Sequence, residues 1–127
     1  MAQGTILVVD DEPNIVRQLA FVLERQQLRV LVASDGQEAL RVIHAERPDV
    51  VLLDVMMPKM NGYEVCEAIK SDADLRSTYV ALLTAKGQEA DRNKGPATGA
   101  DEYIVKPFNP VEMALRLKEL VSSYGSQ

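Results

Sequence analysis

The feature that most constrains the fold of this chain is a set of short apolar runs that end at charged residues. The runs and the residues that end them are 6–9 with Asp10 and Asp11, 50–53 with Asp54, and 103–105 with Lys106. Apolar runs this short, bounded by polar residues, are typical of strands buried on both faces. If the strands are parallel neighbours, their C-terminal ends meet at one edge of the sheet, where open α/β sheets bind ligands.

Strand-like and helix-like segments alternate along the whole chain. The expected strands are 5–9, 29–33, 50–53, 79–83 and 103–105. Apolar residues at helical spacing lie between them, namely Ile15, Leu19, Val22 and Leu23, then Leu40 and Ile43, then Val65 and Ile69. Pro13 and the pair Asn109-Pro110 are helix-start signals. This alternation predicts one α/β domain over 1–127, with a doubly wound parallel sheet, an ordered core at about 4–122 and a tail or linker stub at 123–127.

The last two helical segments differ in apolar content. The segment 87–99 has alanine as its only apolar type apart from Pro96, which cannot donate a backbone hydrogen bond, so we expect a helix that stops by about Lys94. The last helix has an apolar arc that should face the sheet, formed by Met113, Ala114, Leu117, Leu120 and Val121. Val111 and Leu115 fall outside this arc, either as ordinary exposed residues or as part of a partner-binding surface.

Composition excludes several classes of function. A formal net charge of −5 argues against a nucleic-acid-binding face. The single cysteine, Cys66, excludes an internal disulfide and a cysteine-based zinc site. Neither a signal peptide nor an apolar stretch of membrane-spanning length occurs, so we expect a cytoplasmic protein that does not contact a membrane.

The charged residues at the strand ends predict a site for phosphate chemistry. Carboxylates gathered at one edge would repel one another unless a cation joins them, and Mg²⁺ suits a site of oxygen ligands that bridges to phosphate. Lys106 adds a positive charge of the kind that holds a phosphoryl oxygen. An alternative for Asp10 and Asp11 is that they cap a helix that starts at Pro13.

Four motifs in order resemble the receiver domain of two-component response regulators, over essentially the whole chain. They are Asp10-Asp11 after the first strand, Asp54-Val55-Met56-Met57-Pro58 with Asn61-Gly62, Leu83-Thr84-Ala85, and the segment from Gly99 to Phe108. The resemblance implies a flavodoxin-like sheet of five parallel strands in the order 2-1-3-4-5 with five helices. It also implies a phosphorylation-controlled interaction module.

The resemblance implies a role for each matching residue. Asp54 would take a phosphoryl group from a sensor histidine kinase or phosphotransfer protein. Asp11, Asp54 and the backbone carbonyl of Met56 would bind Mg²⁺, or Mn²⁺ in its place, with Asp10 close by and acting through water.

The remaining matched residues would respond to the phosphoryl group. Thr84 and Lys106 would contact its oxygens, and Tyr103 would be the switch aromatic. The bond before Pro107 would be cis. A downstream target or a second copy would bind through the fourth helix, fifth strand and last helix, where Glu112 and Arg116 are available for charge pairing.

Other functions fit the sequence less well. A haloacid-dehalogenase-like phosphatase needs a second Asp two residues after the nucleophile, but Met56 follows Asp54 at that spacing and Glu12 follows Asp10. No nucleotide-binding glycine loop follows the first strand. We therefore expect a chain that catalyses only its own phosphotransfer and dephosphorylation, either with no output domain or as a piece of a longer chain.

Overall fold

The computed structural model describes residues 4–57, 60–85, 99–106 and 108–125. In chain order its elements are β1 (Thr5–Val9), α1 (Pro13–Glu24), β2 (Arg29–Ala33), α2 (Gly36–Glu46), β3 (Val50–Asp54), α3 (Gly62–Ser71), β4 (Tyr79–Ala85), β5 (Glu102–Lys106) and α5 (Pro110–Gly125). The strands form one parallel sheet in the order β2-β1-β3-β4-β5. The predicted fold class and strand order are confirmed.

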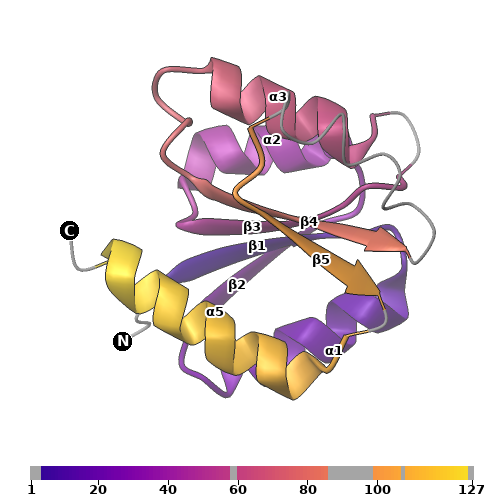
Figure 1. The fold of residues 1–127 in the computed structure, drawn as a ribbon, viewed down its shortest axis with the longest axis vertical. Coiled ribbons are helices and arrows are strands. Elements are labelled where there is room, and N and C mark those ends of the chain that lie inside the picture. The colour runs from indigo at the N-terminus through magenta and orange to yellow at the C-terminus, as the bar shows by residue number, and fades with distance from the viewer. Residues whose placement is uncertain (1–3, 58–59, 86–98, 107, 126–127) are drawn as a thin grey trace.

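The sheet is the middle layer of three. In Figure 1, α2 and α3 cover one face, and α1 and α5 cover the other. Alternate residues of each strand therefore enter two separate cores, as the period of two along a strand requires. Leu7, Val51 and Leu82 pack toward α2 and α3, whereas Val8 and Leu52 pack toward α1 and α5. Both faces of the central strands are buried, which is why their sequences are continuous apolar runs.

Local signals explain where the helices begin. Pro13 occupies the first turn of α1, where its missing N–H costs nothing. The side chain of Asp35 accepts a hydrogen bond from Glu38 N at the start of α2. The Asn109 side chain accepts from two backbone N–H groups, those of Val111 and Glu112, at 3.0 Å each. The start predicted at Asn109-Pro110 is therefore confirmed.

One expectation about the last helix needs correction. The ordered chain does not end near residue 122, because α5 continues to Gly125. No proline interrupts 111–124, so the backbone hydrogen bonds can continue until a glycine favours a stop. Arg116, which we expect to be available for charge pairing across an interface, forms an ion pair with Glu102 in β5, and its side chain is 59% exposed.

The other expectations for this helix hold where the structure describes them. Its arc of apolar residues packs on the sheet, whereas Val111 and Leu115 are 55% and 50% exposed. The predicted helix that stops by about Lys94 falls in 86–98, outside the described residues. In the described ranges, no helix combines the length and apolar character needed to cross a membrane.

Candidate functional site

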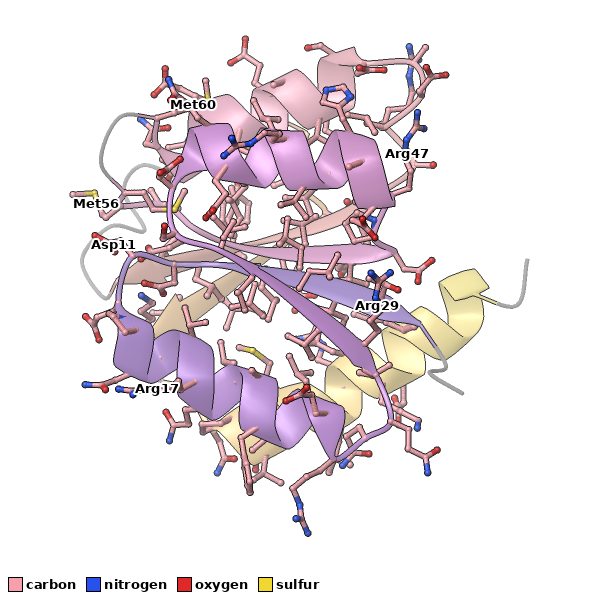
Figure 2. All side chains as sticks on the ribbon, turned by 180° about the vertical axis from the view of Figure 1, so that it is seen from behind. Asp11, Arg17, Arg29, Arg47, Met56 and Met60 are labelled. Carbon is pink, nitrogen blue, oxygen red and sulfur yellow. The ribbon has the colours of Figure 1, made fainter. Side chains whose placement is uncertain are left out.

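Three carboxylates meet where β1 and β3 end. One oxygen from each of Asp10, Asp11 and Asp54 lies within 4.8 Å of the others. The register places Val9 beside Leu53, so the residues that follow them are also neighbours. Asp10 and Asp54 are only 2% and 7% exposed, whereas Asp11 is exposed at the end of the molecule where the strands finish (Figure 2). The cluster thus combines two buried acids with one exposed acid.

Asp10 is held by a backbone N–H of the residue that precedes α1. Its Oδ1 accepts a hydrogen bond from Glu12 N at 2.9 Å. Glu12 is the N-cap residue of α1 and makes no side-chain cap, and the first turn contains no acidic residue. The alternative in which the acidic pair caps this helix is therefore not supported.

Lys106 connects the two buried acids. Its Nζ lies 3.3 Å from Oδ2 of Asp10 and 3.3 Å from Oδ2 of Asp54. Burial by itself would lower the pKa of Lys106, but the attraction of Asp54 and Asp10 outweighs it and raises this pKa above its ordinary value. The lysine is therefore a permanent cation that reaches the site from β5.

Asp54 is an acid whose charge is only partly compensated. Burial and the neighbouring Asp10 raise its pKa from 3.8 to about 6, against the opposing effects of Lys106 and of a hydrogen bond from Met56 N. That bond, from Met56 N to Oδ1, is 3.1 Å long. A second positive charge would stabilise the ionised carboxylate, so the donor set fits a divalent cation that prefers oxygen.

The loop after β3 is held against the strand ends. Val55 N donates to Leu83 O, and Gly62 N donates to Val55 O, both at 3.0 Å. A side chain at Gly62 would place its Cβ 2.5 Å from the carbonyl oxygen of Asp54, so only glycine fits there. Asn61 and Glu64 form a reciprocal capping box at the start of α3. The loop that carries Met56 is thus anchored at both ends.

Thr84 is a buried hydroxyl without a hydrogen-bond partner in the described ranges. It is 1% exposed and lies in β4, one residue beyond Leu83, which pairs with Asp54. A buried hydroxyl without a partner costs free energy, so its retention requires an explanation. A phosphoryl oxygen on the adjacent carboxylate would supply the missing partner.

Of the remaining predicted site residues, Tyr103 and Met56 lie in the described ranges and Pro107 lies outside them. Tyr103 packs against the core between the sheet and α2 and α3, and its hydroxyl oxygen is buried. Met56 is 62% exposed beside the acids. Pro107, for which a cis bond is expected, lies outside the described residues.

The sequence did not predict that the side chain of Lys70, in α3, connects this helix to the start of β5 as a hydrogen-bonded brace. Lys70 Nζ donates to Thr78 O at 2.6 Å, to Arg76 O at 3.0 Å and to Asp101 Oδ2 at 2.8 Å. Asp101 Oδ2 also accepts from Val80 N. The presence of Asp101 in the fifth-strand motif was the available signal, but the sequence does not show which lysine it meets.

Comparison with known proteins gives one family. The family signature described as "Response regulator receiver domain" matches residues 6–118. The chain is 47% identical over 116 residues to "Probable transcriptional regulator ycf27" of Guillardia theta, covering 91% of this chain and 44% of that protein. It is 45% identical over 116 residues to "Alkaline phosphatase synthesis transcriptional regulatory protein PhoP" of Bacillus subtilis (strain 168), covering 91% of this chain and 46% of the relative.

A solved structure agrees with these sequence relatives. The chemotaxis response regulator CheY4 of Vibrio cholerae superposes with a TM-score of 0.84 at 34% identity, over 93% of this chain and 98% of that one. The chain therefore corresponds to nearly all of this regulator but spans less than half the length of the two transcriptional regulators.

Proposed function

Because the chain belongs to the response regulator receiver family of two-component signal transduction, we propose that it accepts a phosphoryl group on Asp54 from a histidine kinase or phosphotransfer protein. The observation that supports this assignment is that a lysine and two further carboxylates lie close to Asp54. Its Oδ2 is 3.3 Å from Lys106 Nζ, and Asp10 and Asp11 lie beside it. The reaction depends on Mg²⁺, and the chain catalyses only its own phosphorylation and dephosphorylation.

The chemistry is an in-line displacement by a carboxylate oxygen. Asp54 forms a P–O bond as the P–N bond of the donor phosphohistidine breaks, and the electron pair of that bond goes to the imidazole. Asp11, Asp54 and the carbonyl of Met56 would hold Mg²⁺, which offsets charge on the phosphoryl oxygens when bound. Asp10, which is deeper, polarises the site and orients Lys106.

Lys106 and Thr84 distinguish the modified from the unmodified state. The lysine ammonium divides its attraction between Asp10 and Asp54 before transfer, and a phosphoryl group offers it a stronger anionic partner. The buried hydroxyl of Thr84 donates to the same group. These contacts exist only in the modified state, which is the condition for shifting a conformational equilibrium.

The proposed output surface includes β5 and α5, and its third expected part, the fourth helix, falls outside the described residues. A cavity of about 190 Å³ is present there, lined by Ile104, Phe108, Asn109, Glu112, Met113 and Arg116. The exposed Val111 and Leu115 lie on the same helix. We propose that phosphorylation, reported by Tyr103, promotes association of this surface with a target protein or a second copy, in the cytoplasm and without direct contact to nucleic acid.

Mass spectrometry tests the proposed phosphoacceptor directly. After incubation with an acyl phosphate and Mg²⁺, the parent should gain the mass of one phosphoryl group, and Asp54→Asn should gain none. Asp74→Asn is the matched control, because Asp74 is exposed and far from the site, and it should label like the parent. Full labelling of the Asp54→Asn variant would show that another residue is the acceptor.

Hydrogen exchange tests the output surface separately. Protection should change on phosphorylation in peptides from residue 87 to residue 120. A change restricted to α1, α2 and β2 would place the output on a different surface while leaving the phosphoacceptor assignment intact.

A further inference from the structure

Met56 has an exposed side chain and a backbone hydrogen bond to Asp54, the proposed phosphoacceptor. Its side chain is 62% exposed, and Figure 2 shows it projecting from the ribbon at the same end of the molecule as Asp11. Its backbone N–H donates to Oδ1 of Asp54 at 3.1 Å. The thioether therefore stands in solvent while its backbone is part of the site.

The other sulfur-containing side chains of the described ranges are less exposed. Met57 and Met60 are partly buried and pack against the core between the sheet and α2 and α3. Met113 is 6% exposed and Cys66 is completely buried. A dissolved oxidant therefore meets one sulfur far more readily than the rest, because oxidation of sulfur follows its exposure.

Resting on the proposed phosphorylation of Asp54, we propose that Met56 is an oxidation site, and that its sulfoxide shortens the lifetime of the phosphorylated state. A peroxide supplies the oxidant. Its O–O bond breaks, one oxygen forms a bond to sulfur, and the other leaves as water or alcohol after taking up a proton. Sulfur loses two electrons and the peroxide gains them.

The lifetime should shorten because oxidation makes the Met56 side chain, which lies next to the site, more polar. Asp54 is only 7% exposed, so water that hydrolyses its acyl phosphate must approach past the residues at the opening. The thioether of Met56 is a weak acceptor, whereas a sulfoxide oxygen accepts strong hydrogen bonds. An acceptor placed there can orient the attacking water, and one hydrogen bond of ordinary strength corresponds to a rate increase of about fivefold.

The backbone of the site should survive this change. Met56 N is bonded to Asp54, and the loop is closed by the hydrogen bond from Gly62 N to Val55 O. None of these bonds involves the Met56 sulfur. Oxidation therefore alters the opening without unfolding the loop, and enzymatic reduction of the sulfoxide would restore the original lifetime.

The first test measures which sulfur reacts. The parent protein is treated with hydrogen peroxide in the absence of phosphodonor and mapped by peptide mass spectrometry over time. Met56 should gain one oxygen several-fold faster than Met57, Met60 or Met113. Equal or faster oxidation of any of these three would overturn the proposal.

The second test measures the half-life of the phosphorylated protein before and after peroxide. The parent should lose its phosphoryl group about fivefold faster after treatment, as should a Met57→Leu control, whereas Met56→Leu should respond no further to peroxide. Met56→Gln, which places an amide oxygen at similar reach, should show the shorter half-life without oxidant. An unchanged half-life in oxidised parent would refute the regulatory role.

The two tests separate this proposal from the proposed function. The order of oxidation is read without phosphorylation, so a parent that oxidises at Met56 but never labels on Asp54 would contradict the phosphoacceptor assignment. Earlier oxidation of the less exposed methionines would contradict the oxidation site alone.

Discussion

Replacing Asp54 by Asn should stabilise the protein, and the gain should depend on pH. Asparagine resembles a protonated aspartic acid at every pH, so the substitution removes only the cost of ionising this buried carboxyl group. In the folded protein, burial and Asp10 raise the pKa of Asp54 from 3.8 to about 6. This cost arises because a charge is forming in a desolvated site beside a second acid.

The sign and size of the effect follow from linkage. Because the folded-state pKa lies above the unfolded value, ionisation opposes folding. The stability present below pH 3.8 is lost as the pH rises through about 6. A difference of about two pH units between the pKa values corresponds to about 3 kcal/mol. At pH 8 the Asp54→Asn protein should therefore be more stable than the parent by up to about 3 kcal/mol, or roughly 10 °C in Tm.

Urea and thermal unfolding between pH 4 and pH 8, with a chelator present, measure this difference. The gain should be largest at pH 8 and close to zero at pH 4. Adding Mg²⁺ at pH 8 should raise the stability of the parent more than that of the variant, because the cation offsets the same carboxylate charge. Glu67→Gln is the control, since Glu67 is exposed on α3 and its neutralisation should leave the free energy of unfolding nearly unchanged.

Two results would refute the reasoning. A gain of equal size at pH 4 and pH 8 would mean that the amide packs or bonds better than the carboxyl group, independently of charge. No gain at pH 8 would mean that Lys106 fully compensates the buried acids.

Further substitutions test other parts of the site. Removing Asp11 by Asp11→Ala should abolish both Mg²⁺ binding and phosphotransfer, and Mg²⁺ titration like that of the parent would show the ligand set to be wrong. Met56 has no carboxylate or amide that could orient the hydrolytic water, so self-dephosphorylation should be slow. The Met56→Asn variant should hydrolyse faster, and an unchanged rate would contradict this explanation. Lys70→Met removes three hydrogen bonds of a charged group and should cost about 3 kcal/mol of stability. Lys118→Met, which removes the hydrogen bond from Lys118 Nζ to Gln26 O, should cost less in the same urea titration, and equal costs would argue against a bracing role for Lys70.

The sequence was sufficient for the elements and their order because burial leaves a local pattern. The central strands are buried on both faces, so β1 and β3 appear as unbroken apolar runs. The helix starts at Pro13 and Asn109 were readable because caps and first-turn prolines act within a few residues. The strand order itself required the family resemblance, since local patterns do not say which strands are neighbours.

Strand and helix ends were less predictable. The expected strands stopped at Leu53, Leu83 and Val105, but the ladders continue to Asp54, Ala85 and Lys106. A charged or polar residue looks like a boundary in the sequence, yet its backbone can still pair with the next strand. Asp54 and Lys106 therefore lie on the last residues of their strands, and the sheet holds their backbones in place.

The identities of the site residues were thus available in the sequence, but their interactions were decided by tertiary structure. Lys106 touches Asp10 and Asp54, which are 96 and 52 residues away, only because the sheet brings these strand ends together. Register and helix packing likewise leave the Thr84 hydroxyl buried, pair Arg116 with Glu102, and expose Met56 while Met57 is partly buried. Residue type is a local property, but burial, charge compensation and side-chain partners depend on segments that meet only when the chain folds.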